Sequence, residues 1–176
     1  MRENGRVRYL TIARHAKAEK ASLNQRDFDR ALSERGRRQC EQLRRWASDD
    51  AALGRFGPTT ALVSAAARTR ETFTRAFDGT SFVADAVVSE LIYNGGRDVS
   101  AEDLLIDLSA IDPVTTSLLV VGHNPTVLEL LWSLVVDLPA AFSERFPTGA
   151  AYVIALPEDQ QIGLASYELV ARYVPD

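Results

Sequence analysis

Two histidines are the residues of this sequence best suited to chemistry, and the chain contains no others. His15 and His123 each follow a short apolar run that is typical of a β-strand. In α/β sheets, ligand sites form at the carboxyl ends of strands. A neutral imidazole, with a reference pKa of ~6.5, is a competent nucleophile at neutral pH. We therefore expect both imidazoles to face a site at this edge of the sheet.

Two arginines accompany these histidines. Arg14 directly precedes His15, and Arg68 opens a predicted helix after the strand that ends near Ser64. Guanidinium groups bind phosphate oxygens in bidentate fashion, and helix amino termini favour anions. Phosphoryl transfer needs an in-line nucleophile and positive groups around the phosphoryl oxygens. The sequence therefore predicts a phosphate pocket in which a histidine accepts the phosphoryl group and water later removes it.

This chemistry needs no metal, because the arginines supply the positive charge. With two histidines and one cysteine, any metal ligands would have to be mostly carboxylates. We expect no metal and no other cofactor. Cys40 cannot form an internal disulfide, lacks a CxxC partner, and is expected in the core.

The elements that must position the pocket alternate in type. A helix is expected from its cap at Ser33 to about residue 52, with Gly36, Cys40, Leu43 and Ala47 on its buried face. Another is expected to begin at Pro125, with Asn124 as its cap, and to end near residue 136. The remaining helices are expected at 68–77 and 101–110, and the strands at 7–13, 60–63, 82–88, 117–121, 151–156 and 164–173. This order predicts an α/β fold, a three-layer α/β/α sandwich with a mostly parallel central sheet.

Length and composition suit one domain. The 176 residues are 46% apolar and 25% charged, and the net charge of −4 excludes a global basic field. The longest apolar run, 127–138, is interrupted by Glu129 and Asp137, so no membrane span is expected. The amino terminus lacks the apolar segment of a secretory signal. We expect a cytoplasmic protein with a single domain over 1–176.

The motifs, taken in order, resemble the histidine phosphatase superfamily, the phosphoglycerate-mutase-like proteins. The run LTIARHAKAE at 10–19 is similar to the first signature, and its alanine after the histidine resembles the SixA-type phosphohistidine phosphatase branch. Further segments resemble the family at 27–39, 64–72, 120–126 and 146–150, so the resemblance spans about 8–156. Ala65 stands where many members have proline, which a loop-to-helix junction should tolerate.

The resemblance implies a role for each matched residue. His15 would be the phosphorylated nucleophile, and Arg14, Arg68 and His123 would hold the phosphoryl group. The short spacings between these motifs leave little room for a large cap domain. An open site suits a phosphoryl group displayed on another protein.

The proton donor is an open role. Many superfamily members place an acidic residue between the arginine and second-histidine motifs, and Glu90 lies at about that point. An alkoxide leaving group needs a general acid, whereas imidazole can depart neutral from a protonated phosphoramidate. Glu90 is therefore either a proton donor or an ordinary carboxylate at a strand end.

The sequence thus predicts a metal-independent phosphohydrolase with a phosphohistidine intermediate, acting on phosphohistidine of a partner protein. A phosphatase of small phosphomonoesters and a non-catalytic phosphate-binding or docking module remain alternatives. The arginine-rich helix at 35–45 is either a solvated face or a docking surface for an acidic partner. We expect no nucleic-acid or membrane partner, and the oligomeric state stays open.

Overall fold

The computed structural model describes residues 7–93, 99–110, 117–135, 138, 145–157, 162–163 and 166–175. Its strands are β1 (Val7–Arg14), β2 (Thr59–Ser64), β3 (Val83–Ser89), β4 (Ser117–Gly122), β5 (Ala151–Pro157) and β6 (Glu168–Tyr173). Its helices are η1 (Asp27–Asp29), α1 (Glu34–Ala47), η2 (Gly54–Phe56), α2 (Ala67–Ala76), α3 (Ala101–Ala110) and α4 (Thr126–Leu134). None of the helices in these ranges is long and apolar enough to cross a membrane.

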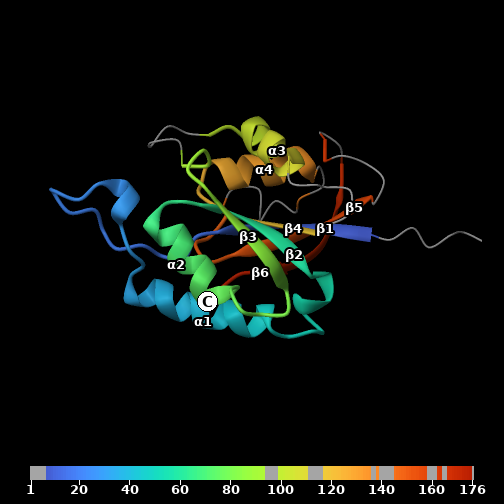
Figure 1. Cartoon of the computed structure of the whole chain (residues 1–176), viewed down its shortest axis with the longest axis horizontal. Helices are drawn as coiled ribbons and strands as arrows, with labels where there is room; N and C mark the ends of the chain where they lie inside the picture. The colour runs from blue at the N-terminus through green and yellow to red at the C-terminus, as the bar shows by residue number, and fades with distance from the viewer. Residues whose placement is uncertain are drawn as a thin grey trace, which may run out of the picture.

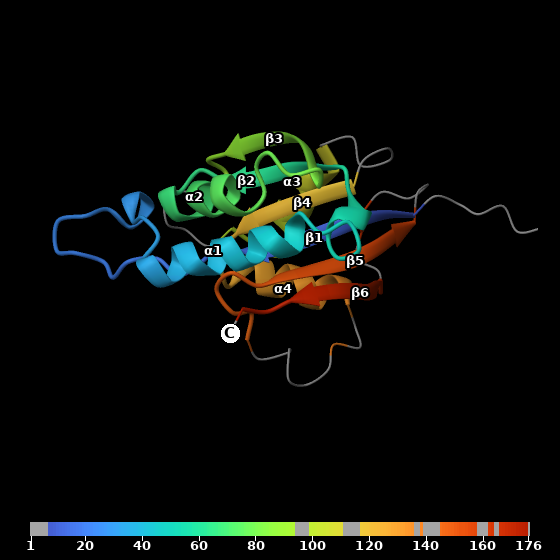
Figure 2. The same cartoon turned by 90° about the horizontal axis from the view of Figure 1, so that it is seen from below.

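The six strands form one mixed sheet in the order β3-β2-β4-β1-β5-β6 (Figure 2). Neighbours from β3 to β1 pair in parallel, whereas β5 runs antiparallel to both β1 and β6. Helices α1 and α2 cover one face of the sheet, and α3 and α4 cover the other (Figure 1). The predicted three-layer sandwich with a mostly parallel sheet is confirmed, and the described chain shows no large cap domain.

Burial on both faces explains why β4 lies in the middle of the sheet. Leu118 and Val120 belong to the core beneath α3 and α4, and Leu119 and Val121 belong to the core beneath α1 and α2. All four side chains are fully buried. An uninterrupted apolar run is what a strand covered on both faces requires.

Helix α1 begins as the sequence predicts but ends earlier. Ser33 Oγ accepts a hydrogen bond from the backbone N–H of Gly36 at 3.1 Å, and the predicted face of α1 is buried. The helix ends at Ala47 rather than near residue 52. Asp49 Oδ1 accepts a hydrogen bond from the backbone N–H of Ala51 at 2.8 Å, and such a local bond favours a turn over another helical turn.

The start of α4 also corrects the sequence prediction. Pro125 occupies the cap position rather than the first helical position, and Asn124 does not cap the helix. The Asn124 amide instead donates to the carbonyl of Phe146 at 3.4 Å. At its other end, α4 gives way at Val135 to extended backbone, before the predicted end near residue 136.

Strand β6 begins at Glu168, and the first predicted residues of that strand, 164–165, lie outside the described residues.

Three strand ends meet at one edge of the sheet. In the parallel ladders Arg14 lies opposite Gly122, and Val63 lies opposite Val121. The ends of β1, β2 and β4 are therefore level with one another. The loop between β1 and α1 extends beyond this edge (Figure 2), so it is placed to contribute to any site there.

Gly36 offers a test of how closely α1 packs on this loop. A Cβ at Gly36 would overlap the carbonyl oxygen of Lys17, which is backbone and accepts a bond from Ser33 Oγ. We expect Gly36→Ala to lower the free energy of unfolding by about 2 kcal/mol, because the backbone has to move. Chemical denaturation measures this loss. The exposed neighbour Arg35→Ala should change stability by under ~0.5 kcal/mol, and equal stability of the two variants would contradict the packing.

Candidate active site

His15 lies buried just beyond the end of β1, with one ring nitrogen engaged. Its backbone N–H donates to the carbonyl of Gly122 at 3.1 Å, which extends the β1–β4 pairing by one residue. Its Nδ1 lies 2.7 Å from the carbonyl oxygen of Ala16. A carbonyl only accepts, so Nδ1 carries the proton and donates. Nε2 is then the ring nitrogen with a free lone pair, which a nucleophile needs.

The residue whose carbonyl orients His15 is anchored to α2 through its backbone N–H. The backbone N–H of Ala16 donates to Thr72 Oγ1 at 3.0 Å, and Thr72 Oγ1 donates to the carbonyl of Arg68 at 2.7 Å. The same turn of α2 therefore carries Arg68 and anchors the N–H of Ala16. The carbonyl of Ala16 belongs to the next peptide, whose N–H, that of Lys17, donates to Gln39 Oε1 of α1 at 2.9 Å.

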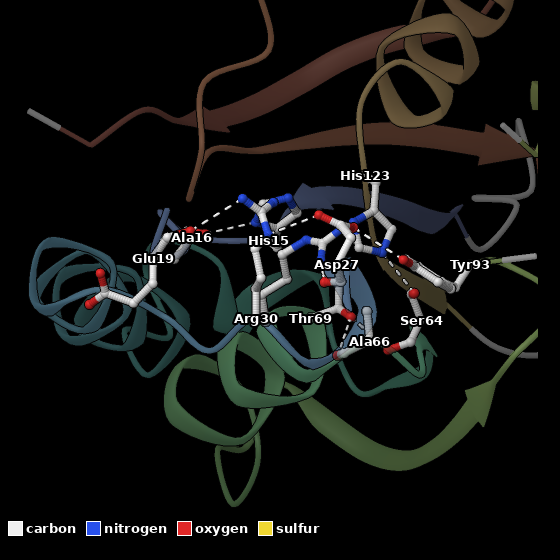
Figure 3. Close-up of polar contacts among 11 residues, drawn as sticks. His15, Ala16, Glu19, Asp27, Arg30, Ser64, Ala66, Thr69, Tyr93 and His123 are labelled. Carbon is white, nitrogen blue, oxygen red and sulfur yellow. Dashed lines mark hydrogen bonds and ion pairs between the residues drawn. The ribbon is translucent and has the colours of Figure 1, made fainter. Parts of the chain in front are cut away.

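His123 follows β4 and lies beside His15. The two ring centroids are 5.1 Å apart, and His123 Nε2 lies 2.8 Å from Ser64 Oγ at the end of β2 (Figure 3). A hydroxyl that donates to Nε2 leaves the proton on Nδ1. His123 Nδ1 is buried and has no hydrogen-bond partner among the described residues.

The two arginines each keep a free buried N–H. Arg14 Nη1 donates to the carbonyl of Phe146 at 2.6 Å. Arg68 donates from Nη1 to the carbonyl of Asp27 at 2.7 Å and pairs through Nη2 with Asp27 Oδ2 at 2.9 Å. The Nε atoms of both arginines are buried and lack a partner within the described part of the chain.

These unpartnered nitrogens together make a candidate anion site. Arg14 Nε, Arg68 Nε and His123 Nδ1 come from three separate segments that meet at the same sheet edge. A buried donor without a partner costs about 1–3 kcal/mol. An oxyanion with several oxygens would satisfy such donors, and a tetrahedral phosphoryl group fits that requirement.

The electrostatics keep both imidazoles neutral. Burial lowers the pKa of His15 well below its usual value, and His123, Arg68 and Arg14 lower it further against the hydrogen bond to Ala16. Burial and Arg68 lower the pKa of His123 to about 3. Burial and Arg68 also lower the pKa of Arg14. The pocket therefore carries its positive charge on guanidinium groups and offers His15 as a neutral base.

The structure thus brings Arg14, His15, Arg68 and His123 together, as the sequence predicts. Glu90 shares no hydrogen bond or ion pair with these four residues. It follows β3, its side chain is exposed, and its carboxylate makes no hydrogen bond or ion pair with any described residue. Its carbonyl accepts from the backbone N–H of Tyr93 at 3.1 Å, so Glu90 lies one turn from a residue of the site.

Several residues that contact these four site residues were not predicted from the sequence. Thr72 accepts from the N–H of Ala16, and Asp27 pairs with Arg68. Ser64 and Tyr93 lie beside His123 (Figure 3). Asp27 and Ser64 lie within the segments that resemble the family, which was a usable signal. Nothing local in the sequence marks Tyr93, because it reaches the site only through tertiary packing.

Other candidate features stay separate from the pocket. In the ranges that the structure describes, no three His, Cys, Asp or Glu side chains are grouped as metal ligands would be. Cys40 is buried, and burial raises the pKa of its thiol to about 12. On the arginine-rich helix, Arg38 pairs with Glu34 at 2.7 Å and Arg37 with Glu71 at 3.1 Å. The docking role of this helix stays a prediction.

Comparisons with solved structures find proteins similar to this chain over almost its whole length. No family model matches the chain, and no curated protein matches it. Among solved structures, a protein from Agrobacterium tumefaciens assigned as phosphohistidine phosphatase SixA is 32% identical, with a TM-score of 0.75 over 96% of this chain and 98% of that chain. A protein from Nakamurella multipartitia with the same assignment is 26% identical, with a TM-score of 0.74 over 96% of each chain.

More distant structures share the fold. A mycobacterial glucosyl-3-phosphoglycerate phosphatase is 17% identical, with a TM-score of 0.59 over 93% of this chain and 97% of that chain. The Agrobacterium protein is similar to this chain over nearly its whole length. This chain also contains, in order, the motifs that resemble the signatures of the superfamily. The chain therefore belongs to the histidine phosphatase superfamily, in its SixA-type branch, and is a phosphatase.

Proposed function

We propose that this phosphatase removes the phosphoryl group from phosphohistidine on a partner protein, through a phosphorylated His15. The observation that carries the proposal is the 2.7 Å bond between His15 Nδ1 and the Ala16 carbonyl, which leaves Nε2 unprotonated inside a positively charged pocket. The similar SixA proteins support phosphohistidine as the substrate class. A further SixA, 20% identical, was solved with tungstate, a tetrahedral oxyanion of the kind that this pocket fits.

The reaction divides into two displacements. In the first, the Nε2 lone pair of His15 forms a bond to phosphorus while the P–N bond of the substrate breaks. The electron pair of that bond leaves with the substrate imidazole, which departs neutral when the phosphoramidate is protonated on its other ring nitrogen. In the second, water attacks phosphorus and the Nε2–P bond breaks. This step releases inorganic phosphate and restores His15.

The pocket residues bind the oxygens of the phosphoryl group during its transfer. Arg14 Nε and Arg68 Nε are the donors left free to bind them, and His123 Nδ1 is a third in the tautomer in which the Ser64 hydroxyl donates to Nε2. Their N–H groups are already in place, so little reorganisation is needed as charge develops in the transition state. The role of His15 Nε2 depends on its neutral state, which burial and the two arginines maintain.

We assign Glu90 a role that depends on the leaving group. Its position one turn before Tyr93, whose ring lies 5.7 Å from that of His123, supports a proton donor on this side of the histidine pair. A phosphohistidine substrate brings its own proton, whereas an alkyl phosphate does not. Glu90 therefore serves phosphomonoesters and is dispensable for phosphohistidine.

The nucleophile assignment predicts the outcome of one substitution. We expect His15→Ala to lower phosphate release by about 10³-fold or more, from both a phosphohistidine-bearing protein domain and an aryl phosphate. Phosphate release without added metal measures this, with Lys20→Ala in the adjoining exposed loop as the matched control. Wild-type activity should be greater on the protein substrate. Full activity of His15→Ala would refute the assignment, and an inactive wild type would favour a phosphate-binding module.

The lowered pKa values predict a distinct titration. Both imidazoles should stay neutral from pH 8 to pH 5, His15 as the Nδ1–H tautomer, with a midpoint for His123 of about 3. In the unfolded chain both titrate near the reference value of ~6.5. Unfolding therefore takes up protons below that pH, and these groups make the fold less stable as pH falls from there.

Nitrogen-15 NMR of the untagged protein measures these states, because the chain has only two histidines. A midpoint near 6.5 for either ring would contradict the burial and charge of the pocket.

The role of Glu90 predicts a difference between substrates. We expect Glu90→Gln to reduce hydrolysis of an alkyl phosphate by about tenfold or more, in line with the loss of a general acid, and to leave phosphohistidine hydrolysis nearly unchanged. Initial rates on the two substrates measure the ratio. Glu102→Gln, at the exposed start of α3, serves as the control. Equal losses on both substrates would disprove the assignment.

A further inference from the structure

The inner arginine of the pocket is held at one edge by Asp27. Arg68 is 7% exposed, and the terminal edge of its guanidinium donates to both the carbonyl and the carboxylate of Asp27, at 2.7 and 2.9 Å. A guanidinium presents a second edge, which contains Nε. Because the terminal edge is occupied, the edge that contains the unpartnered Nε is the one left for a phosphoryl oxygen.

Asp27 is in turn fixed from two sides. Arg30 Nε lies 2.8 Å from Asp27 Oδ1, and the Tyr93 hydroxyl donates to Asp27 Oδ2 at 3.1 Å (Figure 3). The Tyr93 ring also lies 5.8 Å from Arg68 Cζ, within the range of a cation–π contact. The carboxylate therefore connects the loop before α1, helix α2 and the turn after β3.

We propose that Asp27 is a positioning residue for phosphoryl transfer: it holds Arg68 by the terminal edge, so that Nε–H points at the phosphoryl group. This inference rests on the proposed function of the pocket. Arg68 is long and rotatable, and its contribution to catalysis depends on its direction. The Tyr93 hydroxyl, which shares Oδ2 with Arg68, keeps the carboxylate in the orientation that this contact needs.

The negative charge of Asp27 opposes phosphate binding, whereas its hydrogen bonds to Arg68 favour it. Partial burial raises the pKa of Asp27, but Arg68, Arg30 and the hydrogen bonds outweigh burial, and the net shift is downward. The carboxylate is therefore ionised at neutral pH and repels a phosphate dianion. A favourable effect of Asp27 on turnover has to come from the geometry that it imposes on Arg68.

Two neutral substitutions separate these effects. Asp27→Asn and Asp27→Ala remove the same charge and keep the backbone carbonyl that accepts from Nη1, but only asparagine keeps a side-chain acceptor oxygen for Arg68 Nη2. We expect Asp27→Asn to retain kcat within about threefold of wild type and Asp27→Ala to lower kcat about tenfold or more, with a smaller change in KM, because positioning acts in the transition state. Asp29→Ala removes a carboxylate from the same turn, where it pairs with exposed Arg26, and should behave as wild type.

A spectroscopic measurement tests the orientation directly. The Nε–H resonance of Arg68, identified by its loss in Arg68→Lys, should be distinct in wild type and in Asp27→Asn and should shift when tungstate is added. In Asp27→Ala it should move away from its wild-type position, because Arg68 loses the bond from Nη2 and keeps only the bond from Nη1 to the backbone carbonyl. Tyr93→Phe, which removes only the hydroxyl, should show a smaller effect of the same kind. Asp27 is about half exposed, so these variants should fold, and thermal melting checks this.

The outcomes separate this inference from the proposed function. Equal kcat values for Asp27→Ala and Asp27→Asn, with an unchanged Arg68 resonance, would overturn the positioning role. If wild type hydrolyses neither substrate, the proposed function fails, and the tungstate-dependent Arg68 resonance in the two Asp27 variants still decides whether Asp27 orients this side chain.

Discussion

The site depends on the parallel register between β1, β4 and β2. Arg14 lies opposite Gly122 and Val63 opposite Val121, so the residues that follow each strand emerge at the same level. This register brings the rings of His15 and His123 to 5.1 Å despite their distance along the chain. A shift of one residue would turn every side chain of a strand to the other face. Burial of β4 on both faces therefore fixes the fold and the site together.

A second feature of the site is the positive charge of two neighbouring arginines, whose hydrogen-bond donors are only partly satisfied by the fold. Arg14 and Arg68 are close enough for Arg68 to lower the pKa of Arg14, yet each keeps a buried N–H without a partner among the described residues. Such an arrangement costs stability in the free protein. Under the proposed function, an oxyanion would recover that cost on binding. Neutral imidazoles limit the repulsion, and the neutral ring of His15 keeps a lone pair for the proposed attack on phosphorus.

Many features of the fold were predictable from short-range patterns. The Ser33 cap, the buried face of α1 and the apolar run of β4 are local signals, and the structure confirms them. The predictions that were wrong concern the ends of helices, where a single hydrogen bond of one side chain decides whether the helix continues. Asp49 caps a turn that shortens α1, and the Asn124 amide bonds to Phe146 rather than capping α4. The Asp49 turn rests on a local bond that competes with continuation of the helix, whereas the partner of Asn124 lies 22 residues further along the chain.

The sequence by itself determined the alternation of strands and helices and the chemical types at the strand ends, Arg14 with His15, Arg68 and His123. These follow from periodicity and from the order of the motifs, which are properties of neighbouring residues. Only the tertiary structure decided which imidazole nitrogen is free, which guanidinium edge is occupied, and that Asp27 and Tyr93 belong to the site. The reason is physical: hydrogen-bond partners and burial are set by segments far apart in the chain, and they govern direction and protonation.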